Sequence, residues 1–153
     1  MLDRFDRRIL ACLQEDADIS LAALAERVNL TKNPCWRRIQ KLQEAGVIAK
    51  KVALLDGAKL NLGVTVFMNI RTNQHSGEWL RKFEQVVGEI PEVVEFYRMS
   101  GDVDYTLKVV VPSIEAYDAV YRKMIGQIDI YNVSSYFAME KLKNTTALPL
   151  HYA

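Results

Sequence analysis

The sequence lacks the features of a membrane protein and those of a protein held together by disulfides. Its 153 residues include only two cysteines, Cys12 and Cys35, and their spacing matches neither a disulfide framework nor a paired Cys-x-x-Cys zinc pattern. No apolar run approaches the roughly 20 residues that cross a bilayer, and "MLDRFDRRIL" has no signal-peptide core. We therefore expect a globular, cytoplasmic protein without a membrane partner, with reduced cysteines and no bound metal.

Groups for catalysis are also scarce. The two histidines, His75 and His151, fall in an expected loop and in the C-terminal tail. No Ser-His-Asp, Cys-His or paired-carboxylate arrangement occurs with motif spacing. We therefore expect a protein that is not an enzyme and has no cofactor. For the cysteines, a redox switch or a zinc site shared with His75 or His151 stays open as an alternative to ordinary packing.

Positive charge is concentrated in one part of the chain. Residues 1–55 contain 10 basic and 7 acidic groups, a net charge of +3, whereas residues 56–153 contain 10 and 12, a net charge of −2. Within residues 32–51 there are six basic side chains and one acid, Glu44. A local basic strip on a nearly neutral chain indicates a polyanionic partner at that strip.

The first third of the chain has the pattern of three short helices. Apolar residues recur at helical spacing after each of three capping residues, Asp3, Ser20 and Thr31, and Gly46 suits a helix end. The following "VIAKKVALL" is typical of a small hairpin or wing. We expect a winged helix-turn-helix domain over residues 1–55, followed by a linker, "DGAKLN", over residues 56–61.

The remaining residues, 62–153, switch to a pattern of alternating strands and helices. Strands are predicted in "LGVTVFMNIRT", "EVVEFYRM", "VDYTLKVVV" and "VSSYFAMEKL", and helices over about 76–89 and 113–125. The resulting order β-α-β-β-α-β is the ferredoxin-like arrangement, with an antiparallel sheet and both helices on one face. The whole chain is thus predicted to belong to the α+β class, with two domains.

The third expected helix separates an apolar side from a polar side. Cys35, Ile39 and Leu42 form one narrow stripe that should face the first two helices. The other side carries arginine, asparagine and glutamine, which read base edges in the major groove of double-stranded DNA. The candidate DNA-binding residues are Thr31, Lys32, Asn33, Trp36, Arg37, Arg38, Gln40 and Lys41.

Two alternatives stay open for this helix. Its charged residues suit an ordinary solvated helix face, and Trp36 suits partial packing as well as it suits DNA contact. Pro34 would occupy the third helical position, where its missing N–H has no partner within a helix. Helix-turn-helix geometry also implies a dimer that reads half-sites about 34–36 Å apart.

A glycine-containing turn is expected between the second and third strands of the second domain. Gly101 permits a tight turn in "SGDVDY", where backbone N–H groups can hold a carboxylate and Asp104 can accept from an ammonium group. Asp102 and Asp104 project to alternate sides of a regular strand, so only one of them need face a ligand. A simple hairpin turn without a ligand is the alternative.

These motifs together resemble those of the Lrp/AsnC family of transcription regulators. Residues 2–48 are similar to the family's DNA-binding unit, and "GDVDY" is similar to the G-x-x-D-[YF] turn of its effector domain. "NPCWRRIQKL" and the ending "FAMEKLKNTTALPL" resemble the DecR-like subgroup of local regulators. The family's turn is often aromatic at the position of Val103, so the sequence departs from the pattern there.

The resemblance implies a ligand and an assembly for the second domain. The domain would dimerise through its sheet, and dimers would join into tetramers, octamers or hexadecamers. A small effector, commonly an amino acid, would bind between dimers, with Asp104 as the turn's acidic ligand. The candidate effector-binding residues are Ser100, Gly101, Asp102, Asp104, Tyr105, Ser134 and Ser135; for the two serines, a polar strand end facing water is the alternative.

The function predicted from these observations is sequence-specific DNA binding regulated by a small effector. The effector would shift how dimers associate, for which a coupling free energy of about 1–3 kcal/mol suffices. Two other classes stay open. One is an amino-acid-binding interaction module that does not bind DNA directly, and the other is an enzyme built on the ferredoxin-like domain.

Overall fold

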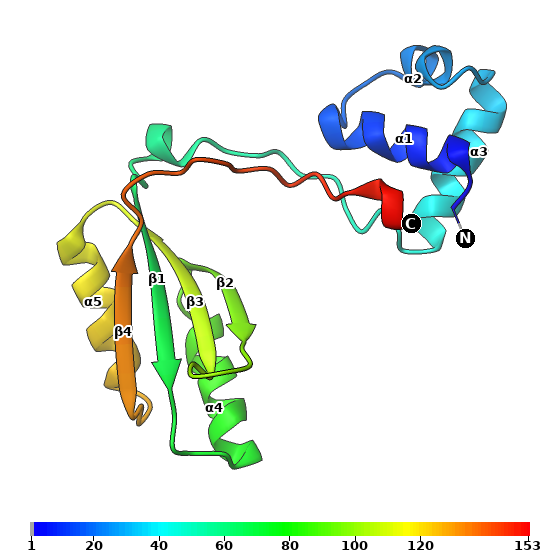
Figure 1. The fold of residues 1–153 in the computed structure, drawn as a ribbon. Helices are drawn as coiled ribbons and strands as arrows, with labels where there is room; N and C mark the ends of the chain where they lie inside the picture. The colour runs from blue at the N-terminus through cyan, green and yellow to red at the C-terminus, as the bar shows by residue number, and fades with distance from the viewer. Residues whose placement is uncertain (1) are drawn as a thin grey trace. The chain divides into compact units, whose positions relative to one another are not determined.

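The computed structural model describes residues 2–153 as two compact units (Figure 1). The first contains the residues up to Leu54 together with Lys143–Ala153, and the second contains Leu55–Leu142. Among the described residues, every helix is too short or too polar to span a bilayer.

The first unit contains the three expected helices, α1 (Arg4–Glu15), α2 (Leu21–Arg27) and α3 (Lys32–Glu44). Asp3 caps α1 by accepting from the backbone N–H groups of Phe5 and Asp6, and the Asp6 side chain accepts in return from the Asp3 N–H. The Ser20 hydroxyl caps α2. Thr31 is the N-cap residue of α3, although its side chain makes no capping hydrogen bond.

The ends of α2 and α3 depend on residues with left-handed backbone. Asn29 has φ +56° between the two helices, and Gly46 has φ +70° after α3. Both values lie in the region that asparagine and glycine adopt most readily. Pro34 occupies the third position of α3, as predicted, so it removes no hydrogen bond from the helix.

One apolar cluster holds the three helices together. Cys35, Ile39 and Leu42 are 0%, 9% and 4% exposed, which confirms the predicted stripe on α3. They lie in a cluster with buried residues of α1 and of the α2 region: Ile9, Leu10, Leu24, Ala25 and Val28. Because this cluster takes up one side of α3, the opposite side is left to solvent.

Of the hairpin or wing expected after α3, the hairpin is absent, because residues 47–55 contain no strand. Ile48 donates its backbone N–H to the Leu42 carbonyl and packs against the helical cluster. Beyond it, Val52, Leu54 and Leu55 are all exposed, so no buried face is available to set a strand register. A short 3₁₀ helix, η1 (Gly57–Leu60), then leads into the second unit.

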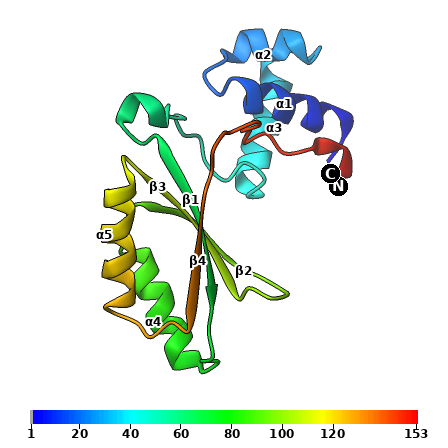
Figure 2. The same cartoon turned by 60° about the vertical axis from the view of Figure 1, so that its left-hand side comes forward.

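The second unit has the predicted β-α-β-β-α-β order. Its elements are β1 (Val64–Arg71), α4 (Gly77–Gly88), β2 (Val93–Arg98), β3 (Tyr105–Val111), α5 (Ile114–Ile125) and β4 (Asn132–Phe137). The strands lie in the order β2-β3-β1-β4 and every neighbouring pair is antiparallel. Figure 2 shows α4 and α5 on the same side of this sheet. Strand β4 ends five residues earlier than the predicted strand.

The strand side chains alternate between a buried face and an open face. On the buried face, Met68 and Leu107 are fully buried under the two helices. The ring of Phe83 in α4 lies 4.9 Å from Trp79 and 5.1 Å from Tyr105. The open face instead presents a row of side chains from three strands: Phe67, Lys108 and Tyr136.

The C-terminal tail differs from the predicted domain boundary. The sequence placed all of residues 62–153 in the second domain, whereas Lys143–Ala153 packs with the first unit. Leu150, in the short 3₁₀ helix η2 (Leu150–Tyr152), contacts the helical cluster. The tail has no repeating apolar pattern, so nothing in its sequence indicates this docking.

The turn between β2 and β3 provides a test of backbone strain. Gly101 has φ +113°, and a Cβ added there would meet no atom within 4 Å. We expect Gly101→Ala to lower the free energy of unfolding by about 1–3 kcal/mol through backbone strain alone. Gly88 is equally open but lies in α4, so Gly88→Ala should stabilise by roughly 0.5–1 kcal/mol. Urea unfolding, followed through the fluorescence of Trp79, measures the free energy of unfolding of both variants. Equal changes in the two variants would contradict backbone strain at Gly101.

Candidate DNA interface and effector site

The polar side of α3 is open to solvent. Six of its eight candidate DNA-binding residues are exposed and two, Arg38 and Gln40, are partly buried; the exposed ones are Thr31, Lys32, Asn33, Trp36, Arg37 and Lys41. Trp36 is 52% exposed, so its indole lies outside the core and half of its surface is available for contact. The side chains that can hydrogen-bond a base edge therefore project from one helix.

Arg38 differs from its neighbours because it is paired within the protein. Its Nη1 lies 2.6 Å from the Asp3 carboxylate and 2.7 Å from that of Asp6. Its guanidinium also lies 5.4 Å from the centre of the Phe5 ring. The sequence placed Arg38 among the DNA contacts. Its observed contacts instead join α3 to the first turn of α1.

The pKa values reflect this pairing. The pKa of Arg38 is raised because its guanidinium donates hydrogen bonds to Asp6 and Asp3. The pKa of Asp3 is lowered, first by the Asp6 backbone N–H and also by the Arg38 side chain. Both shifts favour the charged forms of Arg38 and Asp3, and the carboxylates of Asp3 and Asp6 balance the positive charge of Arg38 inside the unit.

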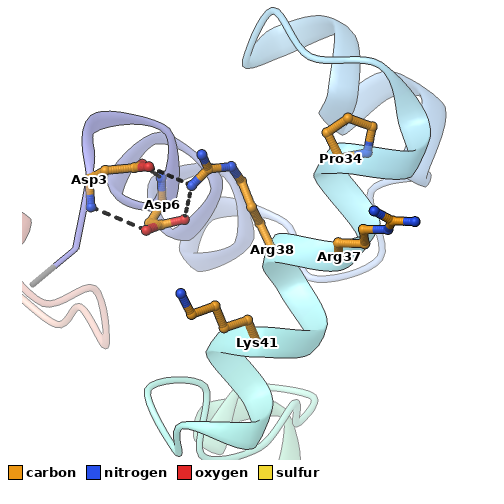
Figure 3. Close-up of a pocket in the computed structure, with 6 residues that line it drawn as sticks. All are labelled: Asp3, Asp6, Pro34, Arg37, Arg38 and Lys41. Atoms are coloured by element: carbon orange, nitrogen blue, oxygen red, sulfur yellow. Dashed lines mark hydrogen bonds and ion pairs between the residues drawn. The ribbon is translucent and has the colours of Figure 1, made fainter.

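A pocket of about 410 Å³ lies between the start of α1 and α3 (Figure 3). Its lining residues are Asp3, Asp6, Pro34, Arg37, Arg38 and Lys41. Figure 3 shows Arg38 extending toward the two aspartates and Arg37 pointing away from them. The pocket thus has an acidic wall from α1 and a basic wall from α3. Arg37 and Lys41 are the cations of this wall that form no ion pair among the described residues.

The two cysteines lie in or beside the helical cluster. Cys35 is buried and Cys12 is partly buried. Burial raises the pKa of the Cys35 thiol, which keeps it protonated and weakly reactive. These observations favour a packing role for Cys35 over a redox switch.

In the second unit, Asp104 organises the turn that precedes β3. Its carboxylate accepts a hydrogen bond from the Thr72 backbone N–H at 2.8 Å. Its own backbone N–H donates to Ile70, and its carbonyl accepts from Met99. Asp104 thereby fastens the turn to the end of β1. Sequence reasoning missed Thr72, because a pairing across 32 residues leaves no local pattern.

The other candidate effector residues fall into two groups. Ser100, Gly101 and Asp102 form the exposed part of the turn. Tyr105 points into the aromatic core and is 7% exposed, which leaves little of its side chain for a ligand. The structure therefore brings the turn residues together and directs Tyr105 away from them.

Ser134 and Ser135 lie on opposite faces of β4. Ser135 pairs with Met68 in register and its hydroxyl is hydrogen-bonded to that of Tyr117 in α5, on the helix side. Ser134 pairs with Asn69 on the open face, where the Asn69 side-chain oxygen accepts from Thr106 at 2.8 Å. Only Ser134 therefore shares the open face.

Comparison with known families agrees with both units. A model described as the Lrp/AsnC ligand binding domain matches residues 65–148, and one described as a winged helix-turn-helix DNA-binding domain matches residues 2–49. The chain belongs to the Lrp/AsnC family. The wing of this Lrp/AsnC protein is thus an irregular segment, without strands.

Individual relatives extend the similarity over nearly the whole chain. The "Glutamate uptake regulatory protein" of Zymomonas mobilis subsp. mobilis is 50% identical, over 97% of this chain and 91% of that protein. "DNA-binding transcriptional activator DecR" of Escherichia coli K12 is 48% identical, over 98% and 99%.

Solved structures show the same fold. An AsnC family transcriptional regulator from Agrobacterium tumefaciens is 62% identical, with a TM-score of 0.96 over 99% of both chains. A transcriptional regulator of Neisseria meningitidis, solved in complex with L-Met, is 30% identical, with a TM-score of 0.94 over 99% of both chains.

Family membership distinguishes a DNA-binding regulator from the DNA-free interaction module that the sequence left open. The first unit matches a DNA-binding domain and the second a ligand-binding domain, so the prediction of a DNA-binding transcriptional regulator is confirmed over that of a DNA-free interaction module. The relatives are transcriptional regulators as well. No enzyme is among the proteins described above.

Substitutions of Arg37 and Arg38 distinguish an arginine that contacts DNA from one that is paired within the protein. Each phosphate contact contributes about 0.9 to the slope of log affinity against log salt concentration. An unrelated duplex offers Arg37 no matching base, so there the exposed side chain, unpaired among the described residues, would meet a phosphate instead. We therefore expect Arg37→Gln to lower the magnitude of the slope on that duplex by about 1. Arg38→Gln should leave the slope unchanged, since its charge is already balanced by Asp3 and Asp6.

Fluorescence anisotropy titrations at several salt concentrations measure both slopes. An equal decrease in the two variants would show that Arg38 leaves the aspartates to contact DNA. The unfolding free energy of each variant, measured in urea, controls for loss of structure.

Proposed function

We propose that the protein binds operator DNA through the exposed side of α3 and binds a small amino acid at the turn of residues 100–104. It acts as a homo-oligomer in the cytoplasm, where its DNA partner lies. The observation that carries the proposal is the occurrence, in one chain, of a basic recognition face and of a glycine-aspartate turn in a ligand-binding fold.

The DNA contacts divide according to the chemistry of the side chains. Arg37, Asn33 and Gln40 can form the bidentate or paired hydrogen bonds that distinguish guanine and adenine. Lys32 and Lys41 lie beside them and suit phosphate contacts, as do Lys50 and Lys51 in the segment after α3. Arg38 holds α3 against α1 instead of contributing a base contact.

The proposed ligand carries both a carboxylate and an ammonium group. The exposed backbone around Gly101 can donate N–H groups to the carboxylate. One oxygen of Asp104 accepts from Thr72, and the other is directed to the ammonium group. The neighbour bound to L-Met and the relative named for glutamate uptake support an amino acid as the ligand class.

The open face of the sheet supports self-association. Phe67 is 40% exposed and Tyr136 is 58% exposed, and the two residues are paired in register on β1 and β4. Beside them, Lys108 is paired with Glu95 at 2.6 Å, so the charge on this face is balanced. A second copy of the sheet would cover these rings and form a dimer, and dimers would assemble further, for example into octamers.

The ligand acts through a difference in its affinity for two assemblies. An amino acid that binds one arrangement of dimers more tightly shifts the population toward it and changes the spacing of the α3 helices along DNA. A coupling of about 1–3 kcal/mol, or 5–150-fold in affinity, is sufficient. No covalent step is required.

The amino-acid site is tested by isothermal titration with a panel of the common amino acids that includes L-methionine and L-glutamate. We expect saturable heat from at least one of them. Asp104→Asn keeps an acceptor for Thr72 but removes the charge, so it should weaken binding by about 10-fold or more. Asp118→Asn, on the exposed side of α5, is the control for overall charge. No heat from any amino acid at high protein concentration would contradict the proposal.

A further inference from the structure

The chain passes between its two units twice. It leaves the first unit at Leu54–Leu55 and returns to it at Leu142–Lys143. A single connection would leave the DNA-binding unit free to swing about one segment. A second connection limits that motion only if the tail is fastened firmly at its far end.

One attachment of the tail is a pair of hydrogen bonds from a single side chain. Gln14 donates from Nε2 to the Leu148 carbonyl at 3.2 Å, and its Oε1 accepts from the Leu148 N–H at 2.6 Å. The amide thus satisfies both backbone groups of Leu148, in the way a neighbouring strand would. The Leu148 side chain makes no such contribution, since it is 73% exposed.

Two further contacts lie on the same side of α1. Arg7 donates from Nη1 to the Ala153 carbonyl at 2.7 Å, and Leu150 packs against the cluster that contains Leu10. Arg7, Leu10 and Gln14 are spaced three and four residues apart, so they form one stripe along α1. The tail therefore follows a continuous surface of the DNA-binding unit.

The segment that leads into the tail follows β4, which is an edge strand of the sheet. Residues 138–142 follow β4, which carries Ser134, and among them Met139 and Leu142 are 95% and 86% exposed. These two apolar side chains of the stretch therefore pack against neither unit.

We propose that Gln14 is a positioning residue that fastens residues 143–153 to α1, so that the DNA-binding unit is held at both ends and its DNA affinity follows the ligand state of the second unit. The ligand response in this inference rests on the proposed function, whereas the attachment of the tail to α1 does not. A tail that only covers the helical cluster would stabilise the first unit without coupling its DNA affinity to ligand binding in the second unit.

Three variants separate these roles. Gln14→Ala removes both hydrogen bonds, and Leu148→Pro removes the donor N–H. Leu148→Ala is the matched control because it retains the backbone groups and trims only an exposed side chain. Hydrogen exchange should show lost protection of the Leu148 amide in Gln14→Ala and normal protection in Leu148→Ala.

The first arm needs no ligand. The chain has two tryptophans, Trp36 in α3 and Trp79 in α4, so Trp79→Phe leaves one reporter in the DNA-binding unit. In this background, time-resolved anisotropy of Trp36 should gain a fast component of nanosecond motion in Gln14→Ala and Leu148→Pro, and not in Leu148→Ala. An unchanged decay in both variants, with protection of the Leu148 amide lost in Gln14→Ala, would overturn the inference.

The second arm uses the amino acid found by titration and a promoter duplex that the protein protects. In Gln14→Ala, amino-acid affinity should match the wild type, while the ligand-dependent change in DNA affinity should fall to about 2-fold or less from the 5–150-fold typical of such coupling. A full ligand response in the variant would overturn the proposed role. If no amino acid binds the wild type, the proposed function fails, and the first arm still decides whether the tail is a fastening.

Discussion

The orientation of α3, the proposed DNA-reading helix, depends on one narrow apolar stripe. Cys35, Ile39 and Leu42 are the residues of α3 that are buried, so burial fixes a single side of the helix and leaves the remainder in solvent. The ion pairs of Arg38 with α1 then set the rotation of that side. In the proposed DNA complex, an arginine bound in this way would contribute to recognition by holding Arg37 and its neighbours in place.

The second unit follows the same rule of one-sided burial. Its sheet buries one face under α4 and α5, and the opposite face retains exposed aromatic rings next to a balanced ion pair. At the end of that sheet, one carboxylate oxygen of Asp104 accepts a hydrogen bond from the Thr72 N–H. The turn is therefore held in shape without a ligand, which would reduce the ordering cost of the proposed ligand binding.

Periodicity in the sequence predicted what is local. The capping residues Asp3 and Ser20, the stripe on α3 and the order of strands all follow from spacing of three to four or of two residues. Contacts between distant segments leave no such signal. The pairing of Arg38 with Asp3 spans 35 residues, and that of Gln14 with Leu148 spans 134. Of the predicted hairpin or wing after α3, the hairpin does not form, because its apolar residues find no buried face.

The most direct test is genomic footprinting in the native cell with the wild type and Arg37→Gln, with and without added amino acids. We expect protected sites in pairs spaced by about one helical turn or its multiples, a changed pattern when the active amino acid is added, and loss of discrete sites in the variant. Sites that are identical in the wild type and in Arg37→Gln would contradict recognition of DNA through this face of α3.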